Sequence, residues 1–173
     1  MLKVASLLFL ALGAGACDSS ADRAAAEERT ARESIAASNE VATRAAAAPS
    51  TGLWTEELLV ERLVRAGVAP RAVTDVPEGP EWMQAKRLYF RAGGGELHVW
   101  IYTDSVARAA VTSLLDASTA TPSGRAVTYE PPLTLVVQNN LAAVITGGDG
   151  RNHERIMLAL QAGLPVRGPG GGQ

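Results

Sequence analysis

Residues 84–103 read QAKRLYFRAGGGELHVWIYT, and this stretch decides the fold. Two runs with the alternating pattern of β-strands flank the glycine-rich segment 92–95. We expect a hairpin with a four-residue loop that pairs Arg91 with Glu96. Because successive side chains point to opposite faces of a sheet, this register separates two kinds of residue. The first face receives only hydrophobic side chains: Leu88, Phe90, Leu97, Val99 and Ile101.

The opposite face of this hairpin is the candidate binding face, made of Arg87, Tyr89, His98, Trp100 and Tyr102. In one interpretation it is an open platform for a ligand or a protein, with Arg87 stacked on Trp100. In the other, loops or a helix cover the rings and make them a second, smaller core. We favour the covered arrangement.

The rest of residues 53–164 predicts the element order α-ββ-α-ββ-α. Thr55 is suited to cap a first helix that ends at Gly67, and a last helix covers 151–162. A second hairpin turns at Asn139–Asn140, and both of its faces are apolar or small, which favours the centre of the sheet. We therefore expect an α+β domain with an antiparallel sheet of about four strands and helices packed mainly on one face.

The segment between the two hairpins is less regular. Asp104 or Ser105 caps a helix there whose predicted buried face is apolar: Val106, Ala110, Val111, Leu114 and Leu115. A polar stretch of about 17 residues follows, which is long for a loop inside a compact domain. Val127 and Tyr129 alternate within it, which indicates a short edge strand.

The first 16 residues have the order of a bacterial secretory signal: a basic start, an apolar run and then small residues. The segment 14–17, Ala-Gly-Ala-Cys, resembles a lipobox, with Ala14 where these motifs usually carry leucine. The resemblance implies cleavage before Cys17 and a lipid on its sulfur, which with two or three acyl chains gives a stable membrane anchor. The alternative is a plain secretory signal with an incidental cysteine.

Residues 17–52 are rich in alanine and charge, with Ile35 and Val41 as the only large apolar side chains. Without an apolar face we expect a frayed, solvated helix or coil that spaces the domain from the membrane. Residues 165–173 are too poor in apolar side chains to order, so we expect a disordered tail.

Composition excludes several functions. After cleavage the chain would carry 15 basic and 18 acidic residues, which gives no basic patch to track nucleic acid. His153-Glu154 lacks the second histidine of a zinc motif, and the run 147–150 lacks the lysine of a phosphate loop. No serine lies in a nucleophile-elbow context. We therefore expect no metal, no cofactor and no recognisable catalytic set.

The runs ELHVWIYTDSVARAA and PPLTLVVQNNLAAVITGG, with the closing helix, resemble a group of uncharacterised bacterial lipoproteins. The resemblance implies an envelope location, with the domain facing the periplasm or the cell exterior, and no particular activity. Our main hypothesis is a membrane-tethered, non-catalytic module that binds an envelope protein or a small ligand. The alternative is an envelope hydrolase whose carboxylates meet only in the folded chain.

Overall fold

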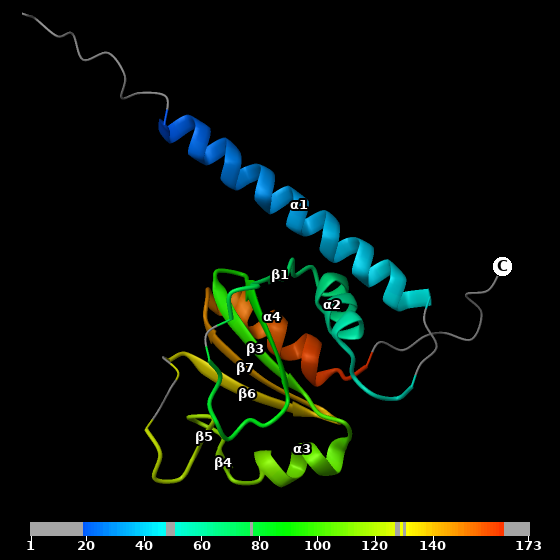
Figure 1. Cartoon of the computed structure of the whole chain (residues 1–173), viewed down its shortest axis with the longest axis vertical. Helices are drawn as coiled ribbons and strands as arrows, with labels where there is room; N and C mark the ends of the chain where they lie inside the picture. Colours follow the sequence, from blue (N-terminus) through cyan, green and yellow to red (C-terminus); the bar gives the residue numbers. More distant parts are fainter. Residues whose placement is uncertain (1–18, 48–50, 77, 127–128, 130, 165–173) are drawn as a thin grey trace, which may run out of the picture.

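The central sheet of the computed structural model has five strands: β1 (Arg71–Ala72), β2 (Lys86–Ala92), β3 (Gly95–Ile101), β6 (Leu133–Gln138) and β7 (Leu141–Gly147). All neighbours pair antiparallel in the order β1-β2-β3-β7-β6 (Figure 1). The structure describes residues 19–47, 51–76, 78–126, 129 and 131–164. The predicted α+β class and antiparallel sheet are confirmed, and the short strand β1 adds a fifth member beside β2.

The register of the β2–β3 hairpin is the predicted one, with Arg91 opposite Glu96. Ala92 and Gly95 also pair, so the turn contains two residues, Gly93 and Gly94, and not four. Both have positive φ values, 59° and 80°. Two consecutive positive φ values match the twist of a tight hairpin, and glycine adopts them without steric cost.

The second hairpin turns at Asn139–Asn140 as predicted, since Gln138 pairs with Leu141. Its two strands differ in position. β7 lies inside the sheet and is buried on both faces, whereas β6 is an edge strand and only partly buried. The prediction that both strands are central is therefore right for β7 and wrong for β6.

The helices are α1 (Ser19–Ala47), α2 (Glu56–Arg65), α3 (Ser105–Thr112) and α4 (Gly150–Gln161). A side-chain oxygen caps the start of α2, α3 and α4. Thr55 accepts from the backbone N–H of Leu58, Asp104 from that of Ala107 and Asp149 from that of Asn152. These caps satisfy amides that have no partner within the helix, which fixes where each helix begins.

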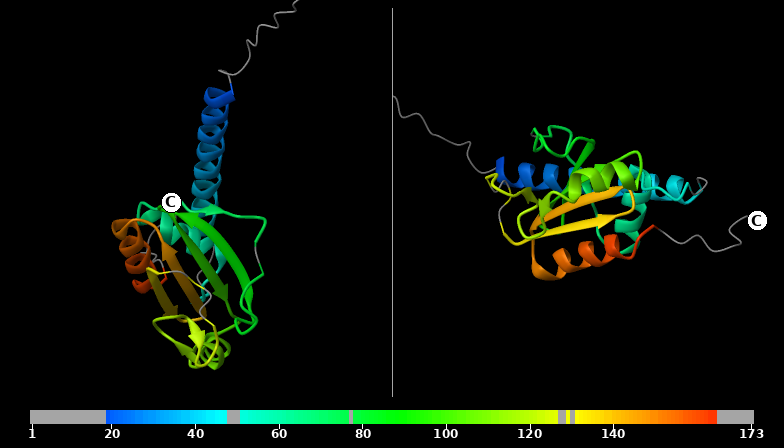
Figure 2. Two further views of the ribbon diagram at one scale, coloured as in Figure 1. Left: turned by 90° about the vertical axis from the view of Figure 1, so that its left-hand side faces the viewer. Right: turned by 90° about the horizontal axis from the view of Figure 1, so that it is seen from below.

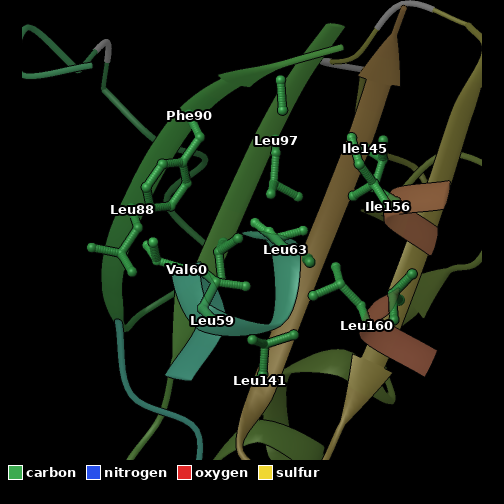
Figure 3. Packing of buried hydrophobic residues seen from close by; sticks show 14 of the residues in the cluster. Leu59, Val60, Leu63, Leu88, Phe90, Leu97, Leu141, Ile145, Ile156 and Leu160 are labelled. Atoms are coloured by element: carbon green, nitrogen blue, oxygen red, sulfur yellow. The ribbon is translucent and has the colours of Figure 1, made fainter. Parts of the chain in front are cut away.

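Helices α2 and α4 pack on one face of the sheet and form the main core (Figure 3). The predicted aliphatic side of the first hairpin lies in it, with Leu97 and Val99 completely buried. Leu59 and Leu63 of α2 lie one turn apart and cover the same face. Leu160 of α4 closes the core beside β7.

The other face of the sheet is covered by α3, by loop segments and by a small second sheet of β4 (Leu115–Asp116) and β5 (Thr121–Pro122). Helices α2 and α4, with Val41 of α1, pack on the main-core face, so the expectation that helices pack mainly on one face is confirmed, with α3 as the exception. Figure 2 shows α3 and the β4–β5 hairpin together, away from α4. Val127 lies outside the described residues, whereas Tyr129 is buried in this second core.

The predicted inner face of α3 is wrong in part. Val106 and Leu114 remain 75% and 67% exposed, while Ala107 and Val111 pack against the second core. Ala107 and Val111 are four residues apart and lie on one side of the helix. Ala110 is exposed as well, whereas Leu115, which lies beyond α3 in β4, packs against the second core as predicted.

Helix α1 is continuous over 29 residues, and its second half is not simply solvated. Val41 packs against the main core, Ala42 is buried, and the Ser38 hydroxyl donates to the carbonyl of Pro70 at 2.7 Å. The expectation that no packing would hold this segment is therefore wrong for its C-terminal half. The N-terminal half extends beyond the domain (Figures 1 and 2). Of the described helices, none has the length and apolar content needed to cross a bilayer.

Candidate functional site

The candidate binding face of the first hairpin is covered. Tyr89, His98, Trp100 and Tyr102 are all buried, with Trp100 only 1% exposed, and Arg87 is half-buried. Met83, Tyr129 and the α3 side chains pack over the sheet at this face. The open platform is therefore not present, and the covered alternative describes the molecule. The physical reason is the large apolar area of these rings, which is removed from water by the segment before β2, by α3 and by the segment after α3.

Arg87, His98 and Glu96 form a continuous polar chain along this face. A guanidinium nitrogen of Arg87 lies 2.8 Å from His98 Nδ1, and His98 Nε2 lies 3.3 Å from a Glu96 carboxylate oxygen. Because a guanidinium can only donate, Nδ1 must accept, and the ring proton is then on Nε2 and directed to Glu96. This arrangement assigns the tautomer of His98 and uses both of its nitrogens.

Stacked rings hold this chain in place. The rings of Tyr89 and His98 are parallel to within 14° with centroids 4.7 Å apart. The Arg87 guanidinium lies 5.8 Å from the Tyr89 ring centroid and 5.7 Å from that of Trp100. The predicted contact between Arg87 and Trp100 is therefore present, but inside the domain. A cation between two rings loses less on desolvation than an isolated buried charge.

Burial and neighbouring charge set the protonation of these groups. Burial, reinforced by the Arg87 charge, lowers the pKa of His98, which favours the neutral ring. Burial also raises the pKa of Tyr89, and the Glu96 carboxylate adds to the effect. Tyr129 has its pKa raised by burial to about 12, so its hydroxyl keeps its proton at neutral pH.

A pocket of about 470 Å³ opens where the cover over this face ends. Its lining includes three predicted residues, Arg87, Tyr89 and His98, but neither Trp100 nor Tyr102. Glu96, Thr146 and the 78–80 loop complete the polar wall. Of the predicted binding face, only the part formed by Arg87, Tyr89 and His98 therefore borders a pocket.

Glycine lets the ends of two strands meet at the edge of the pocket. Gly95 and Gly147 pair across β3 and β7 and both line it. A Cβ at Gly95 would approach the Thr146 carbonyl oxygen to 2.5 Å, so no other residue fits without a shift of the backbone. Glycine at these positions therefore allows a close approach of the two backbones.

The sequence analysis did not assign Tyr129, Glu96 or Thr146 to the site. Tyr129 is 9% exposed, lines the pocket, and has its ring centroid 5.2 Å from that of His98. Its hydroxyl oxygen is fully buried and has no hydrogen-bond partner. The alternation of Val127 and Tyr129 predicted a short edge strand, but this pattern did not connect Tyr129 to the hairpin about 30 residues earlier.

The remaining candidates contribute no second site. Among the described residues, no group of three or more histidine, cysteine or acidic side chains could hold a metal. His153 is not simply solvated: its two nitrogens contact Thr134 Oγ1 at 2.8 Å and the Gly147 carbonyl at 3.2 Å. The run 147–150 ends in the Asp149 cap of α4, as a structural turn does. Cys17, the predicted lipidation site, lies outside the described residues.

No family model, no curated protein and no solved structure matches this chain.

Proposed function

We propose that this chain is a lipid-anchored protein of the bacterial cell envelope, whose folded domain binds a small polar ligand without transforming it. The observation that carries the binding role is the pocket of about 470 Å³ beside His98, where Arg87, Glu96 and Thr146 line the same space as the Tyr89 ring. Pockets with a few convergent polar groups on a rigid apolar wall are typical of small-molecule sites.

Binding fits this pocket better than catalysis. Its described lining residues include no serine or cysteine to act as a nucleophile. Both nitrogens of His98 are engaged, by Arg87 and by Glu96, so the ring is not poised to take a proton from a substrate. The hydrolase alternative needs a carboxylate in a desolvated setting, whereas the Glu96 side chain is 45% exposed and Glu78 is exposed.

The anchored role rests on the first 17 residues and on the geometry of α1. A helix of 29 residues is about 44 Å long, and only its C-terminal half packs on the domain. The free half would hold the pocket away from a membrane surface. This spacing suits a domain that binds molecules dissolved in the periplasm or outside the cell.

A ligand screen on the isotopically labelled protein tests the proposed function. Binding in the pocket should move the backbone amide signals of Gly95, Glu96 and Thr146, and Glu96→Gln, which removes a charge that is 45% exposed in the pocket wall, should reduce the response while leaving the thermal melt unchanged. Asn139, at the opposite end of β7, supplies a control signal that should stay still. If polar metabolites of amino-acid, sugar and nucleotide type all leave the pocket amides unmoved, the proposed binding role fails.

A further inference from the structure

The two edges of the central sheet differ in how they are protected. β1, at one edge, is two residues long and carries Arg71. Short strands and charged side chains are usual devices that keep an edge from pairing with another chain. β6, at the other edge, is six residues long, has neither a charged residue nor a proline, and continues its register with β7 without a bulge. β6 therefore lacks the features that prevent the addition of a further strand.

The hairpin turn determines which backbone groups of β6 point away from β7. A two-residue turn closes on a hydrogen-bonded pair, which here is Gln138 and Leu141. Such pairs alternate along an antiparallel ladder, and at its far end the Gly147 N–H donates to the Pro132 carbonyl at 3.1 Å, in the same phase. The even-numbered residues of β6 therefore face β7. The N–H and C=O groups of the odd-numbered residues point to the outer edge of the sheet: Leu133, Leu135 and Val137.

The layers above and below the sheet contact β6 through its side chains and not through these outward groups. On the main-core face, α4 is joined to β6 by the contact of His153 with Thr134 and by Gln138, whose side chain donates to the Gln161 carbonyl. On the other face, Leu135 packs against the second core. Side chains stand roughly perpendicular to the sheet, whereas the outward groups lie in its plane. Within the described part of the chain, the backbone of residues 133–138 forms hydrogen bonds only with β7.

The outward residues are spaced so that β6 matches a second β6 across a twofold axis. An axis perpendicular to the sheet keeps every side chain on its own face, so a residue pairs only with residues of that face. The antiparallel register centred on Leu135 places this residue opposite its own copy and Leu133 opposite Val137. These pairs are hydrogen-bonded pairs, so every outward N–H and C=O group finds a partner. On the other face Thr134 lies opposite Val136, and no like charges meet.

We propose that two copies of this chain associate through β6 and form one continuous antiparallel sheet of ten strands, five from each copy, with Leu135 at the twofold axis. A second copy fits this edge because the same strand meets every outward backbone group and brings leucine and valine side chains together on the second-core face. A peptide of another sequence would share only the backbone groups. The contact lies outside the pocket and does not rest on the proposed ligand-binding role.

Disulfide formation between single cysteines tests the register. Cys17 is the only cysteine, so in the whole chain with Cys17→Ser an introduced cysteine is the only thiol. Leu135→Cys alone should form a linked dimer on mild oxidation, because facing residues of a hydrogen-bonded pair have their Cα atoms about 5.5 Å apart, within disulfide range. Leu133→Cys and Val137→Cys should link only when the two variants are mixed, since the two copies of either residue lie about 13 Å apart along the strands. Val106→Cys, on the exposed side of α3, is the control for random collisions.

Sedimentation equilibrium of the same Cys17→Ser chain tests the association itself. We expect a monomer–dimer equilibrium in the micromolar range. Leu135→Lys, which brings two like charges together at the axis, should weaken it about tenfold, and Val106→Lys should leave it unchanged. A thermal melt at a concentration where the chain is monomeric verifies the fold of each variant. A chain that stays monomeric at all concentrations, a dimer that Leu135→Lys leaves intact, or Leu133→Cys that links alone as fast as in the mixture would overturn the inference.

Discussion

Asn140 connects three segments of the chain through one side chain. Its amide oxygen accepts from the Trp54 backbone N–H at 2.7 Å, and its amide nitrogen donates to the carbonyls of Trp54 at 3.2 Å and Tyr102 at 2.8 Å. The residue is buried, so these backbone groups have no access to water. The second residue of a tight turn thereby also fixes the start of α2 and the end of β3.

Asn140→Ala should lower the free energy of unfolding by about 3 kcal/mol, because it leaves three buried backbone groups unsatisfied. Urea denaturation followed by circular dichroism measures this change. The neighbouring Asn139→Gly is the control: it loses an exposed contact with the Gly52 carbonyl but relieves a positive φ of 47°, so it should change stability by less than about 1 kcal/mol. Equal effects of the two substitutions would contradict the role given to Asn140.

His98 should make stability depend on pH. Burial and Arg87 lower its pKa in the folded protein, whereas the unfolded chain binds a proton near pH 6.5. The unfolded state therefore holds more protons below about pH 6.5, and the free energy of unfolding falls as the pH drops through that value toward the folded-state pKa.

Urea denaturation at pH 7.5 and 5.5 measures this effect. Wild type should lose stability over the interval, and His98→Gln, which keeps a donor and an acceptor but does not titrate, should lose clearly less. Asp116 and Asp149, whose pKa values are lowered by hydrogen bonds, titrate below this interval. Identical losses in wild type and variant would show that His98 does not sense pH.

At the scale of the element, the hairpins are the part of the fold that sequence predicts best. The alternation of side chains fixes the β2–β3 register, because a shift by one residue would place Arg87 in the main core. The same register places the aromatic side chains of the hairpin together on the opposite face of the sheet. The pocket could be predicted only in part, since Tyr129 reaches it from the long polar segment before β6, whose short alternation gives no partner strand.

Two helices show where the sequence pattern fails. For α3, the predicted inner face includes Val106, which is 75% exposed, while Ala107 and Val111 on another side of the helix pack against the second core. For α1, the packed side consists of small residues at helical spacing: Ala31, Ser34, Ser38, Val41 and Ala42, which are partly or fully buried. A search for large apolar side chains does not detect such a face, although small residues allow close helix contact.

The docking of α1 is tested by making the same change, alanine to aspartate, at a buried and at an exposed position of the helix. Ala42→Asp places a carboxylate at a buried position and should lower the stability by about 2 kcal/mol or detach the C-terminal half of α1. Ala36→Asp, at an exposed position of the same helix, should change it by less than about 0.5 kcal/mol. Hydrogen exchange of the α1 amides shows whether the C-terminal half of the helix detaches, and urea denaturation measures the stability of each variant. A matching response at both positions would mean that α1 does not pack on the domain.

The second core is also an element-scale feature with a direct test. Trp100→Ala removes a ring that is 1% exposed and should cost about 3–5 kcal/mol. Val106→Ala on exposed α3 surface should cost less than about 1 kcal/mol. A cooperative thermal melt of Trp100→Ala near the wild-type temperature would mean that the covered face is not a core.

At the scale of the whole molecule, the proposed anchor at Cys17 would precede a helix whose C-terminal half docks on the domain, and the domain carries a polar pocket. The docked half of α1 fixes the orientation of the domain relative to this helix, because Val41 and Ser38 contact the domain directly. This docking fixes the direction of the pocket relative to the axis of α1.

The mass of the protein purified from bacterial membranes tests the account most directly. We predict a chain that begins at Cys17 and carries two or three acyl groups, with Cys17→Ser recovered in the soluble fraction and without the added mass. A chain that retains residues 1–16, or one that carries a free thiol at Cys17 and leaves the membrane in low salt, would contradict it.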